Sequence, residues 1–203
     1  MSGSDTLILT DDLFLGRGNH KEVYIDPADN HLCVKLLFAE PDEDFDREMR
    51  YRRALGDRVD SMSLLTKYYG AVDTNRGRGY IFERVLDFDG AESRTLLSYL
   101  ENPDDTDDLL DILLGFQKQF LNENFVAAGM DPDNFLVQRT SPSTRCVRII
   151  DNIGTSAKFP LLYHSKFLMA RRARKYWRRF VREIQLEHGN VINSAIAANL
   201  LNF

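Results

Sequence analysis

A lysine stands in the middle of an apolar segment that is expected to form a β-strand. The segment HLCVKLLF covers residues 31–38 and places Lys35 between Val34 and Leu36. Burying an ammonium group costs free energy unless a partner accepts its hydrogen bonds and charge. Because both neighbours are apolar, side-chain alternation leaves open whether Lys35 points inward or toward solvent. If it points inward, Glu48, on the helix predicted to follow, is the candidate partner.

The composition is that of an ordinary globular chain. Of 203 residues, 43% are hydrophobic and 28% are charged, which is typical of soluble domains. The sequence holds no run of about 18 apolar residues and no secretory signal pattern, so no transmembrane segment is expected. Cys33 and Cys146 lie in apolar segments and are interpreted as buried thiols of a cytoplasmic protein. The net charge of −5 argues against nucleic acid as a partner.

The first part of the chain is dominated by short segments rich in branched and aromatic residues, separated by turn residues. A helix is predicted from residue 44 to 55, with Gly56 as its stop. This pattern predicts a five-stranded antiparallel sheet with one helix inserted after the third strand. The predicted strands cover residues 13–15, 22–25, 32–38, 64–73 and 80–86.

The second part is mainly helical, with two short strands around a Ser/Thr/Pro turn. We therefore expect an α+β fold in one domain over residues 1–203, with an N-lobe at about 10–88 and a helical C-lobe at about 89–203. The predicted helices cover residues 93–100, 107–123 and 165–187 with a short final helix, and the strands cover 135–137 and 146–150.

The glycines of the segment LGRGNHKEVYI are candidates for binding phosphate. Gly16 and Gly18 have no Cβ, so their backbone amides can approach a ligand closely. Lys21 stands where a third glycine of such a loop would fall. A plain hairpin turn remains the alternative.

The strand segment YIFERV, residues 80–85, is a candidate for contacting a nucleotide base. The backbone around Glu83 and Val85 could offer one carbonyl and one amide to an adenine edge, with Phe82 lining the pocket. A core strand that simply ends there is the alternative.

Asn134 and Asp151 are the candidate metal ligands. Asp151 follows the apolar strand CVRII, whose end would deliver its carboxylate into a cleft. Hard oxygen ligands suit Mg²⁺, and two protein oxygens suffice when phosphates and water complete the shell. A turn formed by Asp151 and Asn152 is the alternative.

These residues together resemble the protein-kinase-like superfamily and, more closely, the bacterial YrbL-like PhoP regulatory network protein family. The resemblance covers roughly residues 13–185. It implies a two-lobed protein-kinase-like fold that binds ATP and Mg²⁺, with Lys35 on the phosphates, and a role in a bacterial regulatory circuit. The shared stretches are GRGNHKEVY at 16–24, CVK at 33–35, REMRY at 47–51, GYIF at 79–82, DFDG at 87–90, DPDN at 131–134, DNIG at 151–154 and KYWRRF at 175–180.

The chain departs from the protein-kinase pattern where the catalytic base is expected. Gly129 stands at that position, and Asp131 stands where a loop lysine would be. Glycine cannot accept a proton, so Asp131 is the candidate substitute base beside Lys35 and Asp151, and Asp133, which is expected to face away, is the alternative. The short remainder after Asp151 predicts a truncated C-lobe. Two hypotheses stay open. One is an atypical phosphotransferase with a small or non-peptide substrate, or one that transfers the nucleotide part of ATP. The other is a pseudokinase that binds nucleotide without catalysis.

The predicted helix over residues 165–187 combines an apolar stripe with many basic side chains. Ala173, Trp177 and Val181 share one side of the helix, which is expected to face the core. The opposite, basic side is expected to be a solvated face; a surface that binds nucleic acid, anionic lipid or a partner protein is the alternative. Within the helix of residues 44–55, Arg47 and Arg50 are expected to be solvated.

Overall fold

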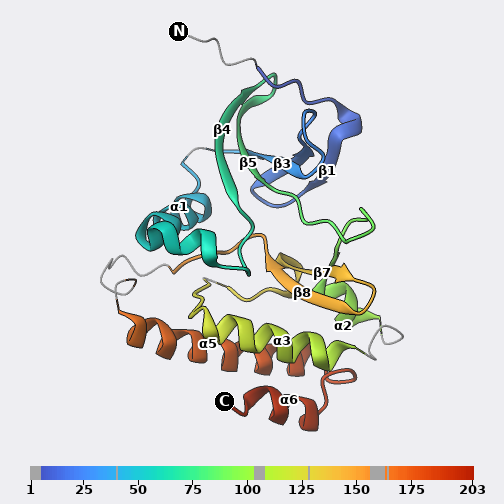
Figure 1. Cartoon of the computed structure of the whole chain (residues 1–203), viewed down its shortest axis with the longest axis vertical. Coiled ribbons are helices and arrows are strands. Elements are labelled where there is room, and N and C mark those ends of the chain that lie inside the picture. The colour runs from blue at the N-terminus through green and yellow to red at the C-terminus, as the bar shows by residue number, and fades with distance from the viewer. Residues whose placement is uncertain (1–5, 40, 103–107, 128, 156–162, 164) are drawn as a thin grey trace.

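The computed structural model describes residues 6–39, 41–102, 108–127, 129–155, 163 and 165–203. A five-stranded sheet forms one end of the molecule and a group of helices forms the other (Figure 1). The α+β class predicted from the sequence is confirmed. The N-terminus lies at the sheet end and the C-terminus at the helical end.

The large sheet is antiparallel throughout and has the strand order β1-β2-β3-β5-β4. All five predicted strands are present, but the fourth begins at Tyr68, because Leu64 and Leu65 pack into the core of the helical end instead. A 3-10 helix, η1 (Asp11–Leu13), precedes the sheet. The strands are β1 (Phe14–Arg17), β2 (Lys21–Ile25), β3 (Leu32–Leu37), β4 (Tyr68–Thr74) and β5 (Gly77–Glu83).

Both faces of this sheet are covered, which explains why alternation could not orient Lys35. Val34 and Leu36 face one apolar cluster with Tyr24. Cys33 faces a second cluster, which also contains Phe82. Because successive side chains of a strand point to opposite faces, Lys35 lies on the face of Cys33.

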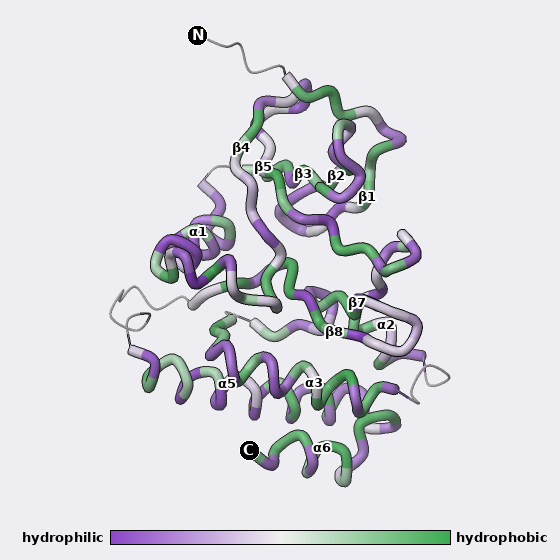
Figure 2. Tube along the Cα trace, viewed as in Figure 1, coloured by the Kyte–Doolittle hydropathy of each residue, from purple (hydrophilic) through white to green (hydrophobic). Residues whose placement is uncertain are grey.

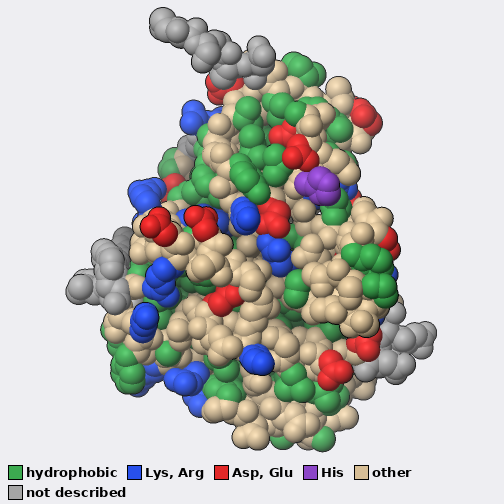
Figure 3. Space-filling model, viewed as in Figure 1, with side chains coloured by type: hydrophobic (Ala, Val, Ile, Leu, Met, Phe, Trp, Pro, Cys, Tyr) green, Lys and Arg blue, Asp and Glu red, His purple; other side chains and the backbone are tan. Residues whose placement is uncertain are grey.

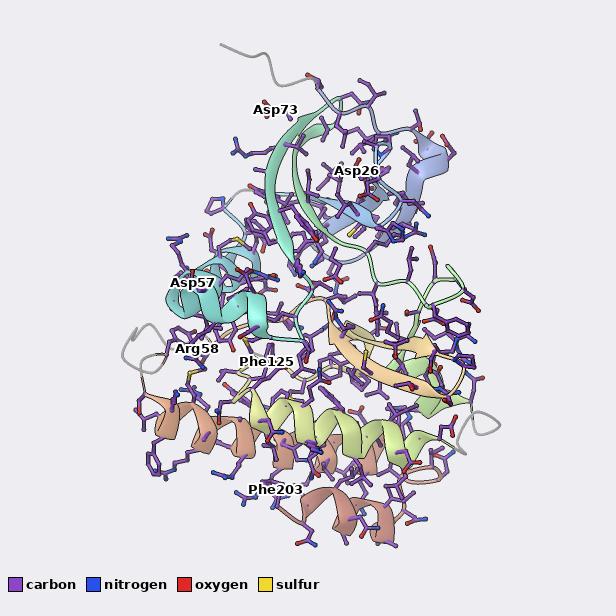
Figure 4. All side chains as sticks on the ribbon, in the orientation of Figure 1. Asp26, Asp57, Arg58, Asp73, Phe125 and Phe203 are labelled. Atoms are coloured by element: carbon purple, nitrogen blue, oxygen red, sulfur yellow. The ribbon has the colours of Figure 1, made fainter. Side chains whose placement is uncertain are left out.

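Helix α1 (Glu43–Leu55) joins the two ends of the molecule. It begins at Asp42, whose carboxylate accepts hydrogen bonds from two amides of the first turn, and it ends at Gly56 with a φ of 55°. Tyr51 of α1 contacts Phe125 at 5.8 Å between ring centroids, and Phe125 lies between α1 and the helices below it (Figure 4). A 3-10 helix, η2 (Gly56–Ser61), follows.

The helical end is built around one large apolar core. Trp177 is fully buried and donates a hydrogen bond from Nε1 to the Leu200 carbonyl at 2.8 Å. Helix α5 carries both hydrophilic and hydrophobic residues along its length (Figure 2). Its apolar stripe, which includes Ala173 and Val181, is buried in this core as predicted. The elements are β6 (Arg94–Thr95), α2 (Leu96–Glu101), α3 (Leu109–Asn122), η4 (Pro132–Asn134), β7 (Phe135–Ser141), β8 (Thr144–Ile149), α5 (Lys166–Glu187) and α6 (Ser194–Leu201).

The segment between β5 and β6 is fastened to β7 by an acidic side chain. Asp87 accepts hydrogen bonds from the backbone amide and Nε of Arg139 at 2.9 and 2.6 Å, and from the Ser93 hydroxyl at 2.6 Å. The same arginine reaches Asp89 at 2.5 Å. The DFDG motif therefore forms a turn that hydrogen bonds and ion pairs hold in place where the sheet end meets the helical end.

Within the described part of the chain, no helix combines the length and the apolarity that crossing a bilayer requires.

Candidate functional site

Two cavities lie side by side between the sheet end and the helical end, and they share Lys21, Lys35 and Asp151. The first has a volume of about 310 Å³ and is lined mainly by charged and polar side chains. The second has a volume of about 290 Å³, and most of its exposed lining surface is apolar, although polar side chains such as Thr66 and Glu92 also border it. On the face shown in Figure 3, acidic and basic side chains gather in a band below the sheet. We call the two spaces the charged cavity and the apolar cavity.

Lys35 points inward, at the boundary of the two cavities. It is 7% exposed, and its Nζ donates a hydrogen bond to the Ile150 carbonyl at 2.7 Å. The ammonium group also lies 4.2 Å from the centre of the Phe82 ring, a cation–π contact. Burial lowers the pKa of Lys35, and the nearby ammonium group of Lys21 lowers it further, while Asp151 and Glu48 offset part of the shift.

Glu48 lines the charged cavity, but its ion-pair partner is Arg52 and not Lys35. The carboxylate of Glu48 lies 2.6 Å from Arg52, four residues later on α1, and both side chains are buried. Arg52 also donates to the Thr66 carbonyl at 2.8 Å. The expected Lys35–Glu48 ion pair is therefore absent, because Arg52, one helical turn away, pairs with the Glu48 carboxylate instead.

Asp151 is paired with Lys21, a residue for which the sequence predicts no role in the site. The Nζ of Lys21, the first residue of β2, forms an ion pair with Asp151 Oδ2, and the two side chains are 19% and 26% exposed. Burial alone would raise the pKa of Asp151, but the ammonium groups of Lys35 and Lys21 outweigh it and hold that pKa below its usual range.

Asn134 lies beside Asp151 because the backbone ties their segments together. The Ile150 amide donates to the Asn134 carbonyl at 3.0 Å, and both Asn134 and Asp151 line the charged cavity. The preceding Asp131 caps the short helix η4, since its side chain accepts from the Asp133 amide at 3.1 Å. Asp131 and Asp133 line the same cavity.

The donor set of the charged cavity fits a magnesium ion that arrives with a phosphate ligand. In the described residues, no three His, Cys, Asp or Glu side chains are grouped so that they could hold a metal alone. Asp151 and Asn134 supply one carboxylate and one amide oxygen, and Mg²⁺ commonly takes the rest of its shell from phosphates and water.

The apolar cavity contains the residues predicted to face a base. Glu83 and Val85 both line it, together with Cys33. The Glu83 side chain points to Arg148 at 2.5 Å and to the Lys67 amide at 3.0 Å. The Val85 amide makes no hydrogen bond to any described residue. Cys33 is buried as predicted, whereas Cys146 is only half-buried.

The glycine turn lies over both cavities. Gly16 lines the apolar cavity and Gly18 lines the charged one. The Gly18 amide donates to the Lys21 carbonyl at 2.9 Å and closes the turn. A Cβ at Gly16 would meet nothing within 4 Å, so space for a ligand remains beside this backbone.

The solvated position expected for Arg47 is wrong. Its guanidinium pairs with Asp44 at 2.7 Å and donates to the Ile153 carbonyl at 3.3 Å, and the side chain is only 11% exposed. Arg47 therefore anchors the DNIG segment to α1. Arg50 is exposed, as expected.

Gly129 lies next to Asn152, and a Cβ built on it would stand 3.8 Å from the Asn152 amide nitrogen. A Cβ at this position would make only an ordinary van der Waals contact with the Asn152 side chain. Gly129 thus lies beside the DNIG segment and brings no carboxylate to it.

This is an α+β protein with a charged and an apolar cavity meeting at two lysines and an aspartate. Residues 7–185 match the family described as PhoP regulatory network protein YrbL. The chain is 34% identical over 173 residues to proteins named "Uncharacterized protein YrbL" from Escherichia coli (strain K12) and Shigella flexneri, covering 82% of each chain. The chain belongs to the YrbL family.

Proposed function

We propose that this chain is a protein-kinase-like, magnesium-dependent ATP-binding protein. The observation that carries the proposal is the junction of the two cavities at Lys21, Lys35 and Asp151. A nucleotide has an apolar, flat base and a multiply charged phosphate tail, and the two adjoining cavities match this division. The two-lobed kinase-like arrangement is part of the proposal.

The base would enter the apolar cavity, with its edge facing the Glu83 carbonyl and the Val85 amide, which bonds no described residue. The phosphates would enter the charged cavity, where Lys35 supplies a positive charge without solvent competition. Magnesium, when bound, neutralises phosphate charge and aligns the phosphates. Asp151 and Asn134 would hold it, and Gly16 and Gly18 would let the phosphates approach the backbone.

The geometry favours nucleotide binding over fast phosphoryl transfer. Asp131 is engaged in capping η4, and Gly129 offers no proton acceptor. A positioned general base contributes about 10²- to 10⁴-fold in rate, so a chain without one would transfer phosphate slowly. We place the protein as a nucleotide-binding signalling module with slow transfer at most.

Its role would lie in the PhoP regulatory network, as the family description indicates for its members. The exposed side of α5 is strongly basic, although the chain as a whole has a net charge of −5. An acidic surface of a protein partner would complement it. The exposed basic residues there are Arg171, Arg174, Lys175, Arg178, Arg179 and Arg182.

Thermal unfolding with Mg-ATP tests the binding proposal. A ligand that binds only the folded state adds about 2.7 kcal/mol of stability at 100 times its Kd. We expect Mg-ATP to raise Tm in the parent, and Lys35→Met and Asp151→Asn each to abolish the rise while remaining folded. Lys118→Met, at an exposed position of α3, is the matched control. The absence of any rise in the parent would contradict the proposal.

Incubation with labelled ATP tests the catalytic part. We expect slow self-labelling at most with ATP labelled at the γ- or the α-phosphate. Asp131→Ala should reduce any label if that carboxylate serves as base. Rapid turnover that survives Asp131→Ala would contradict the account of this loop, and ATP binding without label from either position would select the non-catalytic module.

A further inference from the structure

Two lysines converge on one short segment of the chain. Lys21 and Lys35 come from adjacent strands of the sheet, and Lys21 contacts Asp151 while Lys35 contacts the Ile150 carbonyl. In the β2–β3 register, Val23 pairs with Lys35 and Lys21 pairs with Leu37. Since Lys21 and Val23 are two residues apart, both lysines lie on the same face of the sheet.

The charges at this junction do not balance. Glu48 is neutralised by Arg52, so the two ammonium groups share the single carboxylate of Asp151. Like charges this close repel each other, and Lys21 contributes to lowering the pKa of Lys35. At this contact two ammonium groups face one carboxylate, which favours an anion such as a nucleotide phosphate. The charged cavity as a whole is lined by more carboxylates than ammonium groups, Asp131 and Asp133 among them, so a phosphate tail would need Mg²⁺ with it.

The contact between Lys21 and Asp151 also uses the carboxylate that a metal ion would need. An ammonium group and Mg²⁺ compete for the same oxygens. Lys21 lies at the end of the glycine turn, beside Gly18, and Asp151 lies on the opposite wall of the charged cavity. The ion pair thus closes the turn onto the opposite wall in the absence of ligand.

We infer that Lys21 is a second phosphate-binding lysine, and that it occupies the metal ligand Asp151 when no nucleotide is bound. Without nucleotide it holds Asp151; with Mg-nucleotide the ion takes Asp151 and the ammonium group moves to the phosphates. The inference rests on the proposed function for its phosphate half. It assigns Lys21 a role in place of the glycine expected at this point of the turn.

The test compares Lys21→Met with the parent in two measurements. Calorimetric titration should show Mg-ATP binding about tenfold weaker in Lys21→Met, a loss of about 1.4 kcal/mol. Adenosine binding should change much less, because Lys21 only borders the apolar cavity. With Mg²⁺ alone, Lys21→Met should gain thermal stability at several-fold lower ion concentration than the parent, because Asp151 is released. The double variant Lys21→Met/Asp151→Asn should lose that gain.

Two further variants serve as controls. Arg17→Met removes a neighbouring exposed cation, which pairs with Glu22 and lines neither cavity, and should leave both measurements unchanged. Lys21→Arg keeps the charge and should retain most of the Mg-ATP affinity.

Each outcome decides something. The inference is wrong if Lys21→Met binds Mg-ATP as tightly as the parent does, or responds to Mg²⁺ alone as the parent does. The proposed function is retained in that case, provided that the parent binds Mg-ATP. A parent chain that fails to bind Mg-ATP removes the proposed function, and the inference with it.

Discussion

The charged cavity and the apolar cavity differ in whether the polar groups that line them already have hydrogen-bond or ion-pair partners. In the charged cavity most acidic groups are engaged: Asp42 caps α1, Asp44 pairs with Arg47, Glu48 pairs with Arg52, and Asp151 pairs with Lys21. In the apolar cavity most of the exposed wall is hydrophobic, the charged pair Arg84–Glu92 at its border is matched, and the Val85 amide bonds no described residue. A base can therefore enter without rearrangement, whereas phosphate must exchange existing contacts.

This difference separates two contributions to binding. The apolar cavity would supply affinity by burial of apolar surface, which depends little on ions. The charged cavity would supply affinity only after Lys21 leaves Asp151, so its contribution depends on metal and on the charges that compete for it. The following experiments test each half of this comparison.

The largest expected effect follows from breaking the buried pair in the wall of the charged cavity. Glu48→Ala leaves the Arg52 guanidinium, which is 8% exposed, without its carboxylate. Removing one partner of a buried ion pair costs about 3–5 kcal/mol of unfolding free energy, which urea unfolding would measure.

The matched control is Glu183→Ala. Glu183 pairs with Arg179 at the same spacing of four residues, on exposed α5, and exposed pairs contribute little. Similar losses in the two variants would show that the wall of the charged cavity is not held by its ion pair.

Removing magnesium should separate the two cavities directly. We expect ATP affinity to fall at least about tenfold in a chelator, about 1.4 kcal/mol, because Lys21 then stays on Asp151 and the phosphates face the other carboxylates of the charged cavity without a metal ion. Adenosine, which lacks phosphate, should bind equally with and without magnesium in calorimetric titration. Equal losses for both ligands would mean that the cavities do not act separately.

The sequence predicted the elements of this fold because their signals are local. The apolar stripe of α5 repeats at helical spacing, and Trp177 lies in the core where that spacing places it. The five strands carry turn residues at their ends. The start of β4 was placed four residues too early because Leu64 and Leu65 are apolar like a strand but pack with the helical end.

The contacts between candidate site residues were harder to predict, because they depend on register and packing. Lys35 could not be oriented, since both faces of its strand are buried. The pairing of Lys21 with Asp151 joins residues 130 positions apart, and no local pattern indicates it. The Glu48–Arg52 pair had a usable signal, namely opposite charges four residues apart on one predicted helix.

A smaller effect is expected at the cysteine in the wall of the apolar cavity. Burial raises the pKa of the Cys33 thiol, which slows its reaction with an alkylating reagent. Adenosine at ten times its Kd leaves about one site in eleven free, so it should slow alkylation of Cys33 about tenfold. Peptide mass analysis over time would measure the rate.

Cys146 provides the internal control for this measurement. It is half-buried in β8 and lines neither cavity, so its alkylation should be unaffected. Tripolyphosphate, which lacks a base, should leave Cys33 unprotected. Equal protection of both cysteines would indicate a general change in the protein and not occupation of the apolar cavity.

The smallest expected effect concerns the turn that closes the far side of the apolar cavity. Burial alone would raise the pKa of Asp87, but hydrogen bonds from Ser93 and Arg139 outweigh it and hold that pKa below its usual value. A depressed carboxyl pKa contributes stability that is present above pH about 3.9 and lost as pH falls through the folded-state pKa. Asp87→Asn should therefore lower the free energy of unfolding by about 1 kcal/mol at neutral pH, and this difference from the parent should shrink in acid.

Unfolding curves from pH 7 to 3 would measure this difference. The control is Asp73→Asn, at an exposed position of β4 (Figure 4), which is expected to change stability little. A difference that stays constant over this pH range would mean that the Asp87 charge does not hold the turn to β7.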